Sequence, residues 1–276
     1  MTEMAEQAEE SHVLLEMEGS IAWIRLNRAD KLNPIGSLAR RQLDAALKQV
    51  ERDESVRCVV LIGSGRAFSA GADVQEMSRG DGQMRSPEDV GRVLREEYLV
   101  MLQRLRTMPK PVICGMNGLA AGIGASFALA CDIRIAAEDA YISEAFANLG
   151  LGPDGGVSWT LPRFIGRGRA LEMFYTAERL SAQDAERFGV VNRVVPKEAV
   201  EAECRTLAQR LATASIGALA GAKRAVNFAE GSSFEEAAEF EAYLQEVCAA
   251  GDDYREGVSA FLEKRKANFK GPRADG

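Results

Sequence analysis

An uncharged run of twenty residues, from Val112 to Cys131, constrains the fold of this chain more than any other stretch. It begins as a short β-type run, turns at Asn117-Gly118, and continues as an apolar helix over about residues 123–130. Its glycines allow the backbone to approach another group closely. The amino end of such a helix offers free N–H groups and a partial positive charge, which suit an anionic oxygen. A packing seam of small residues between a helix and a sheet explains the same pattern, so both interpretations stay open here.

The same run is long enough to cross a membrane, and Gly118 and Gly122 have the spacing of a membrane-helix dimer motif. However, it is built from Ala, Gly, Ser, Asn and Cys more than from Leu or Ile, and Asn-Gly is a turn signal. The mean hydropathy of the chain, -0.16, is typical of a soluble protein. We therefore expect a buried strand-turn-helix and no membrane association.

Length and charge limit the classes of function. A chain of 276 residues with 46% apolar residues can form one large domain, or one domain with an appendage. The net charge of -7 gives no reason to expect a nucleic-acid partner. The five cysteines are scattered, without the spacing of a metal site or a disulfide framework, which indicates reduced thiols and a cytoplasmic location.

The chain has a single histidine, His12. A Ser-His-Asp triad, a Cys-His pair and a histidine-rich metal site are therefore not expected. The chemistry must depend on carboxylates, backbone donors or a bound cofactor. Residues 1–11 are acidic and lack the features of a signal peptide, so we expect them to form a disordered lead-in.

The order of elements favours an α/β fold with a mostly parallel sheet. Residues 13–17 and 21–26 are typical of a β-hairpin, a helix is expected over 37–52, and 56–62 is a continuous apolar strand. A glycine-rich loop, 63–73, follows that strand, and such loops usually bind ligands in α/β sheets. It contains no phosphate-loop or dinucleotide-binding motif.

The remaining sequence is mostly helical. One further strand is expected at 190–195. The expected helices are 88–107, 161–177, 181–188, 199–212, 216–229, 234–248 and 252–267.

Several motifs occur together in a characteristic order. The chain carries Ala67-Phe68-Ser69-Ala70-Gly71-Ala72-Asp73, then Lys110-Pro111-Val112 with Asn117-Gly118, then Leu180-Ser181-Ala182, and finally the charged segment 261–269. With these motifs it resembles the crotonase (enoyl-CoA hydratase/isomerase) superfamily over about residues 12–270, and most closely its 1,2-epoxyphenylacetyl-CoA isomerase-like and 3-enoyl-CoA isomerase members.

The resemblance implies an architecture and a substrate class. We expect a spiral of repeated ββα units over 12–196 and a helical C-terminal trimerisation region over 197–276. Relatives assemble as homotrimers or dimers of trimers. The substrate would be an acyl-CoA thioester, with no metal and no separate cofactor, since coenzyme A is part of the substrate.

The same resemblance assigns two backbone donors. In the family, two loops each give one N–H to the thioester carbonyl, and by position these belong to Ala72 and Ile123. Such donors stabilise the negative charge of an enolate oxygen. The two glutamates of the hydratases correspond to Ser126 and Phe146 here, so both carboxylates are missing and simple hydration of a 2-enoyl-CoA is not favoured.

Asp154 stands where several isomerases of the superfamily carry their catalytic acid. An alternative is that it caps the following helix, as Asp often does. Glu144 precedes Phe146 by two residues, which on a helix is about 200° around the axis. A shifted alignment would make Glu144 the second catalytic carboxylate, but the spacing to Gly152-Pro153 favours Phe146 at that position. We therefore expect Glu144 to face away from the site, as a surface or structural residue.

The family's contacts with coenzyme A also carry over by position. They fall on Ala29, Lys31 and Leu32, on Ala70, and on Phe261 and Lys264 of the terminal helix, which in relatives reach the nucleotide of a neighbouring subunit. Phe146 would line the acyl pocket. Asp30 stands where relatives often have Lys, which weakens one phosphate contact.

These features lead to one preferred function and two alternatives. The preferred function is an acyl-CoA isomerase that shifts a 3-enoyl-CoA to the 2-enoyl form, or rearranges a ring-derived CoA ester as in phenylacetate breakdown, with Asp154 as the only acid–base carboxylate. The first alternative is an enoyl-CoA hydratase of fatty acid β-oxidation. The second is a homologue that binds acyl-CoA without catalysis.

Overall fold

Two sheets form the core of the molecule. The computed structural model describes residues 11–77 and 84–270. The larger sheet has the strand order β1-β2-β3-β5-β7-β10, and the smaller has the order β4-β6-β8-β9. The strands are β1 Val13–Glu18, β2 Ile21–Leu26, β3 Cys58–Gly63, β4 Ala67–Ser69, β5 Val112–Met116, β6 Leu119–Ala121, β7 Ile133–Ala137, β8 Tyr141–Ser143, β9 Arg179–Ser181 and β10 Arg193–Val195.

Successive strands pass from the larger sheet to the smaller one and are followed by helix. The pairs β3–β4, β5–β6 and β7–β8 each make this step. Strands β2, β3, β5 and β7 pair in parallel, as do β4, β6 and β8, whereas β1 and β2 form an antiparallel hairpin. This repetition of one strand per sheet and then a helix confirms the expected spiral of ββα units.

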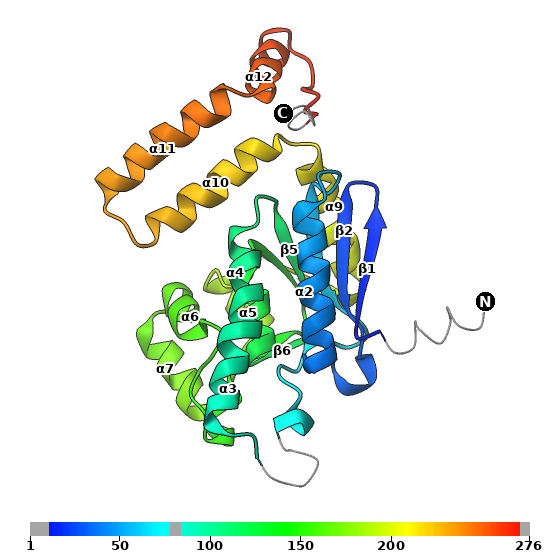
Figure 1. The fold of residues 1–276 in the computed structure, drawn as a ribbon, viewed down its shortest axis with the longest axis vertical. Helices are drawn as coiled ribbons and strands as arrows, with labels where there is room; N and C mark the ends of the chain where they lie inside the picture. Colours follow the sequence, from blue (N-terminus) through cyan, green and yellow to red (C-terminus); the bar gives the residue numbers. More distant parts are fainter. Residues whose placement is uncertain (1–10, 78–83, 271–276) are drawn as a thin grey trace, which may run out of the picture.

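Helices cover the larger sheet (Figure 1). The helices of the spiral are η1 Ala29–Lys31, α2 Ser37–Arg52, η2 Val74–Met77, α3 Pro87–Val93, η3 Leu94–Tyr98, α4 Leu99–Thr107, α5 Ile123–Ala130, η4 Ala145–Leu149, α6 Val157–Ile165, α7 Arg167–Thr176, α8 Ala182–Arg187, η5 Lys197–Ala199 and α9 Val200–Ala212. Helix α2 packs against the β1–β2 hairpin and α4, while α9 packs on β3, β5 and β7. Every residue of β3 and β5 is buried, as expected for parallel strands covered on both faces.

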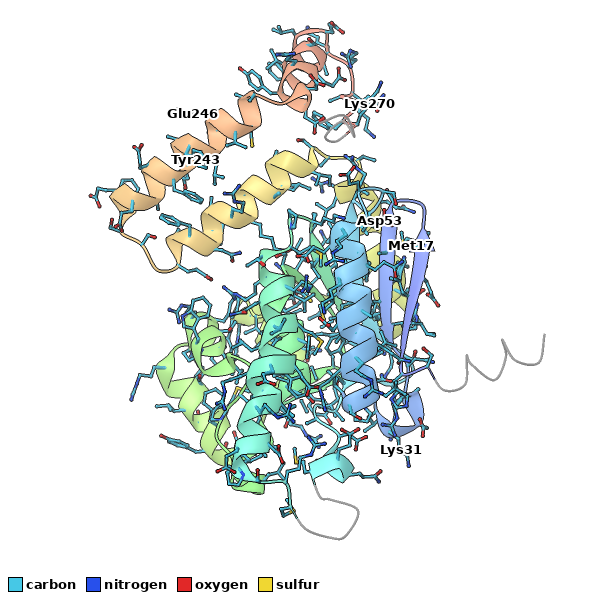
Figure 2. The ribbon with its side chains drawn as sticks, viewed as in Figure 1. Met17, Lys31, Asp53, Tyr243, Glu246 and Lys270 are labelled. Carbon is cyan, nitrogen blue, oxygen red and sulfur yellow. The ribbon has the colours of Figure 1, made fainter. Side chains whose placement is uncertain are left out.

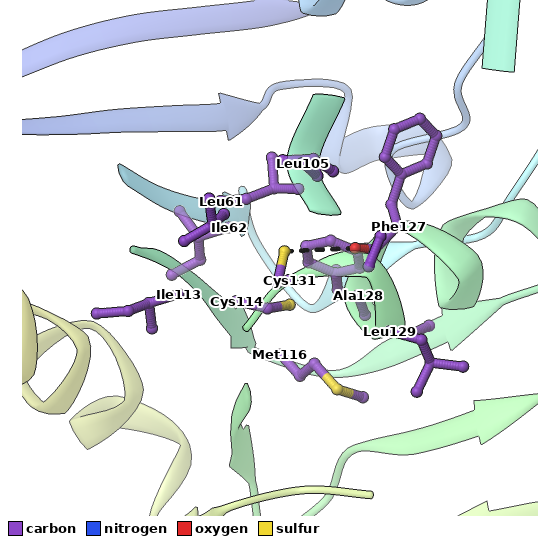
Figure 3. Close-up of a cluster of buried hydrophobic side chains, with 14 of the residues drawn as sticks. Leu61, Ile62, Leu105, Ile113, Cys114, Met116, Phe127, Ala128, Leu129 and Cys131 are labelled. Carbon is purple, nitrogen blue, oxygen red and sulfur yellow. Dashed lines mark hydrogen bonds between the residues drawn. The ribbon is translucent and has the colours of Figure 1, made fainter. Parts of the chain in front are cut away.

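Helix α5 is part of the main core. All of its residues are buried. Figure 3 shows Phe127, Ala128 and Leu129 of this helix in one buried cluster with Ile113 and Met116 of β5 and Leu61 of β3, and Leu129 lies next to Met116. The uncharged run is therefore a buried strand-turn-helix, as predicted. Within residues 11–77 and 84–270, none of the helices combines the length and the apolar character that a membrane crossing requires.

Three helices follow the spiral, α10 Ile216–Ala229, α11 Phe234–Ala249 and α12 Asp252–Leu262. Helices α10 and α11 pack against each other and extend away from the sheets, with α12 at the far end (Figure 1). Large apolar side chains on them are exposed, among them Phe234 and Phe261, each 83% exposed. The C-terminal part is thus helical, as expected from its pattern.

The structure differs from the sequence prediction at several boundaries. The single helix expected over 161–177 is two helices, α6 and α7, which break at Gly166, where φ is 81°. The last helix ends at Leu262 and not at 267, because Lys264 adopts a left-handed φ of 54°. The short strands of the smaller sheet were not predicted. Apart from Ser11, the expected lead-in lies outside the described residues.

Gly118 lies in the turn between β5 and β6. We expect Gly118→Ala to lower the free energy of unfolding by about 1–3 kcal/mol, because the new Cβ would overlap the backbone oxygen of Arg66. Gly152→Ala is the matched control, since no atom lies within 4 Å of the position of its Cβ. It should change stability by less than about 0.5 kcal/mol. Urea unfolding of both variants measures the difference, and equal stabilities would contradict the packing described here.

Candidate functional site

Two backbone loops meet at the amino end of α5. Gly71 has a φ of +94°, and a Cβ placed on it would lie 2.7 Å from the carbonyl oxygen of Ala121 and 3.7 Å from the backbone nitrogen of Ile123. Such a contact leaves no room for a side chain. The glycine-rich loop after β3 and the turn before α5 are therefore in direct backbone contact.

Each loop presents an unused donor. Ile123 is the first residue of α5, and its N-cap, Gly122, provides no side-chain cap. Within the part of the chain that the structure describes, neither the Ala72 N–H nor the Ile123 N–H donates a hydrogen bond to the protein. Two free N–H groups thus lie on adjoining loops, one of them at a helix amino end where the helix dipole favours negative charge.

Hydrogen bonds from the preceding loop fix the position of residues 70–72. The Ile35 N–H donates to the Gly71 carbonyl at 2.7 Å, and the Ala70 N–H donates to the Leu32 carbonyl at 2.8 Å. The Gly71 N–H donates to the Ser69 hydroxyl at 3.1 Å, and this hydroxyl donates to the Asn33 carbonyl at 2.8 Å. Because these bonds are buried, they hold the Ala72 loop in one place without occupying its own N–H.

Asp154 lies beside the same helix end. Its Oδ1 is buried without a hydrogen-bond partner in the described structure, and burial raises the pKa of its carboxyl to about 6. The Ser126 hydroxyl donates to the backbone oxygen of Asp154 at 3.2 Å. A Cβ on the next residue, Gly155, would lie 2.6 Å from Ile123 Cδ1, so this turn packs directly on the first turn of α5.

The capping alternative for Asp154 is wrong. Helix α6 begins at Val157, its N-cap is Gly156, and no side chain caps it. Asp154 accepts a hydrogen bond from the Val157 N–H only through its backbone oxygen, at 3.1 Å. The carboxylate is therefore free for another role.

Ser126 and Phe146 occupy the two positions that correspond to the glutamates of the hydratases, and their surroundings differ. Ser126 is buried in α5 and contacts Asp154 as described above. Phe146 is 8% exposed, and its ring atoms lie 3.5 and 3.6 Å from the position of a Cβ on Gly122. An apolar ring therefore covers the turn that leads into α5.

Glu144 corrects the expectation made from the sequence. It is fully buried, 0% exposed, and both carboxylate oxygens lack a hydrogen-bond partner among the described residues. The chain from β8 into η4 is not an α-helix, and burial alternates, with Ile142, Glu144 and Phe146 buried. Glu144 thus shares the inward side with Phe146, because a period of two replaces the assumed helical period.

The electrostatics of Glu144 are linked to those of Asp154. Burial raises the pKa of the Glu144 carboxyl well above its usual range, and the negative charge of Asp154 raises it further. The sequence contained one signal for this residue, the period-two alternation of strand β8 continued one position beyond its last residue, Ser143.

The expected contacts with coenzyme A fall into two separate groups. Ala29 and Lys31 lie in η1, and Leu32 follows it and is joined to Ala70 by the hydrogen bond given above. Phe261 and Lys264 belong to α12 and its end, and both are exposed. In Figure 2, Lys31 lies at one end of the molecule and α12 at the other, so one chain does not bring the two groups together.

Two sizeable cavities lie away from the contact between the two loops, and Phe261 lines the larger of them. One, of about 530 Å³, is lined by Leu129 and Cys131 at the carboxyl end of α5 together with Trp159 and Lys223. The other, of about 850 Å³, lies between α10, α11 and α12. The free N–H groups of Ala72 and Ile123 and the unpartnered carboxyl of Asp154 lie at the opposite end of α5. These groups define the candidate site.

The raised pKa of Asp154 makes a prediction about stability. An Asp with a pKa of about 6 in the folded state and about 3.9 in the unfolded state binds its proton more tightly when folded. This contribution to stability is complete below about pH 4 and is lost as the pH rises through 6. We expect Asp154→Asn to be more stable than the wild type at pH 8, by up to about 3 kcal/mol, and equal to it at pH 4.

Guanidinium unfolding at the two pH values measures this difference. Glu138→Gln, which changes an exposed carboxylate at the turn before β8, is the control and should match the wild type at both. A loss of stability at pH 8 in Asp154→Asn would instead mean that the carboxylate supports the fold.

Comparison with known proteins places this chain in a family. The family model described as enoyl-CoA hydratase/isomerase matches residues 16–272. The chain is 40% identical to 1,2-epoxyphenylacetyl-CoA isomerase of Escherichia coli over 94% of its own length and 98% of that protein's. It is 39% identical to a probable enoyl-CoA hydratase of Rhodobacter capsulatus, covering 93% and 96%.

Solved structures agree with the sequence matches. The crystal structure of enoyl-CoA hydratase from Bacillus anthracis superposes with a TM-score of 0.88 at 32% identity, covering 95% of this chain and 100% of that one. The relatives include proteins named as isomerases and proteins named as hydratases. The chain therefore belongs to the enoyl-CoA hydratase/isomerase family of the crotonase superfamily and is an enzyme of that family.

Proposed function

We propose that this enzyme is an acyl-CoA isomerase that moves the double bond of a 3-enoyl-CoA to the 2 position, or rearranges a ring-derived CoA ester in the same way. The observation that carries the proposal is one unpartnered, desolvated carboxylate, Asp154, beside the two free N–H groups of Ala72 and Ile123. The similarity to a 1,2-epoxyphenylacetyl-CoA isomerase supports it.

The proposed mechanism needs only groups of this chain and the substrate. The Asp154 carboxylate takes a proton from C2 of the acyl chain, and the resulting negative charge collects on the thioester oxygen. The N–H groups of Ala72 and Ile123 donate to that oxygen. In enzymes of this type, one such donor contributes about 10²–10³ in rate. Asp154 then returns the proton to C4, so the double bond moves and no water is added.

The surroundings of Asp154 suit this proton transfer. A pKa of about 6 leaves the carboxyl ionised at neutral pH, yet more basic than an exposed Asp. Phe146 covers the turn before α5 with an apolar ring, which would keep water from the dienolate. Coenzyme A is part of the substrate in this proposal, and no further cofactor is needed.

Enoyl-CoA hydratase is the second candidate, because several relatives carry that name. Hydration needs a group that activates water, and Ser126 and Phe146 replace the glutamates that would do so. Glu144 is the remaining carboxylate in this region, but it is fully buried. A homologue that only binds acyl-CoA is the third candidate, and turnover of any enoyl-CoA would exclude it.

The proposal extends to substrate binding and assembly. Ala29, Lys31, Leu32 and Ala70 would contact coenzyme A in their own subunit, and Phe261 and Lys264 would reach the nucleotide bound by a neighbour. The distance between these groups within one chain, visible in Figure 2, supports a homotrimer or a dimer of trimers. The similarity to an enzyme named for an epoxyphenylacetyl-CoA supports a role in phenylacetate breakdown.

We expect Asp154→Asn to reduce the rate of conjugation of a 3-enoyl-CoA by at least about 10²-fold, because the amide cannot accept the proton. Binding of the CoA ester should stay within a few fold of the wild type, since the free N–H groups are unchanged. The absorbance of the conjugated thioester measures the rate, and calorimetric titration measures binding. Full turnover by this variant would remove Asp154 from the mechanism.

We also expect kcat for isomerisation to fall as the pH drops through about 6, because the base is active only when ionised. Above that pH the rate should reach a plateau. A pH–rate profile from pH 4.5 to 8 tests this, and a profile without an acid limb near 6 would be inconsistent with a desolvated Asp154 as the base.

A further inference from the structure

Glu144 is a buried carboxyl group that the proposed mechanism does not use. Its side chain is 0% exposed, and neither carboxylate oxygen has a hydrogen-bond partner in the described part of the chain. A buried, unpaired polar group of this kind lowers the stability of a fold. We therefore look for a function of Glu144 that offsets this loss of stability.

The backbone brings Glu144 to the same helix end as Asp154. The Gly122 N–H donates to the Ser143 carbonyl at 3.0 Å. Ile123 is the residue after Gly122 and Glu144 is the residue after Ser143, so this hydrogen bond brings their backbones close together. From the other side, Ser126 in the first turn of α5 donates to the backbone of Asp154. Both carboxyl groups thus lie beside the first turn of α5, one on β8–η4 and one before α6.

The other charged and titratable groups near the pair are few. Asp154 is the charged residue that acts electrostatically on Glu144, and Asp154 also acts on Tyr98 of η3. The Tyr98 hydroxyl donates to the Ile35 carbonyl at 2.6 Å and receives a bond from Arg40, so it is already occupied. Burial raises the pKa of Tyr98 to about 12, which keeps it neutral. No cation is thus left to pair with either carboxyl group among these neighbours.

We propose that Glu144 is a positioning residue for Asp154: it stays a neutral carboxylic acid and donates its O–H to the Asp154 carboxylate when the site is occupied by substrate. The inference rests on the proposed function, because it assigns Glu144 a role in the same proton transfer. Two carboxylates in one dry region cannot both ionise readily, and the more deeply buried one keeps the proton. Glu144 is the more deeply buried of the two.

The protons balance through one turnover. At rest, Glu144 carries one proton and Asp154 none. Asp154 takes the proton from C2, so two neutral acids face the dienolate, and it returns this proton to C4, which restores the resting state. Glu144 gains and loses nothing. Its contribution is to orient Asp154 and to stabilise the charge of that carboxylate while substrate is bound, before Asp154 takes the proton.

Two substitutions of Glu144 separate this role from a structural one. Glu144→Leu removes the donor, so the Asp154 carboxylate is less stabilised. We expect the acid limb of the kcat profile to move up by about one pH unit and kcat to fall by about tenfold, with KM within about twofold. Glu144→Gln keeps a neutral donor of similar shape, and its acid limb and kcat should stay close to those of the wild type.

In Glu144→Leu we expect thermal stability and kcat to change in opposite directions. Because Glu144→Leu replaces a buried, unpartnered polar group by an apolar one, its thermal unfolding midpoint should rise while its kcat falls. A structural role would lower the midpoint and leave the pH profile unchanged. Equal pH profiles for wild type, Glu144→Leu and Glu144→Gln would overturn the proposal.

An infrared measurement tests the resting proton without any turnover. At pH 7.5 the wild type should show the carbonyl stretch of a protonated carboxyl group, which Glu144→Gln should lose and the control Glu138→Gln should keep. Absence of that band in the wild type would overturn the inference even if isomerisation is found. Presence of the band with no isomerase activity would refute the proposed function and leave the protonated Glu144 established, so the two failures are distinguishable.

Discussion

The close backbone contact between two loops is the constraint on which the rest of the site depends. At Gly71 any side chain would overlap the carbonyl of Ala121, and only this approach brings the N–H of Ala72 next to that of Ile123. The hydrogen bond from the Ile35 N–H and the one to the Leu32 carbonyl hold the first loop, and the one to the Ser143 carbonyl holds the second. Since these bonds use neighbouring groups, both donors stay free. The spiral architecture supplies the contact, because β4 and β6 are paired strands that carry the two loops.

The same burial that protects the donors determines the acid–base chemistry. Asp154 and Glu144 both lie where water is largely excluded, and desolvation raises the pKa of each carboxyl. Among the described residues, no cation acts on either carboxyl to compensate. In a fold selected only for stability, such groups would be replaced by apolar side chains. Their presence beside two free N–H groups is the pattern expected of a site that accepts some loss of stability for catalysis.

The sequence predicted the long elements well and the local geometry of the site less well. Helix α2 and the β1–β2 hairpin follow their periodicity closely, and α5 follows from the uncharged run. Strands β4, β6 and β8 have three residues each and are stabilised by pairing with distant segments, so no local pattern marks them. Glu144 was misplaced because an α-helical period was assumed where the chain passes from strand β8 into the short helix η4. Ala72 and Ile123 act through main-chain groups, which residue type does not reveal, so their assignment came from family resemblance.

The isomerase and hydratase activities are separated by assaying the wild-type enzyme with two substrates in separate cuvettes. With a 3-enoyl-CoA, we expect the absorbance of a conjugated thioester to appear at an enzymatic rate. With a 2-enoyl-CoA, we expect this absorbance to persist, because Ser126 and Phe146 replace the glutamates that would activate water. Rapid loss of conjugation from the 2-enoyl-CoA would contradict a single-carboxylate isomerase and would show that the enzyme is a hydratase.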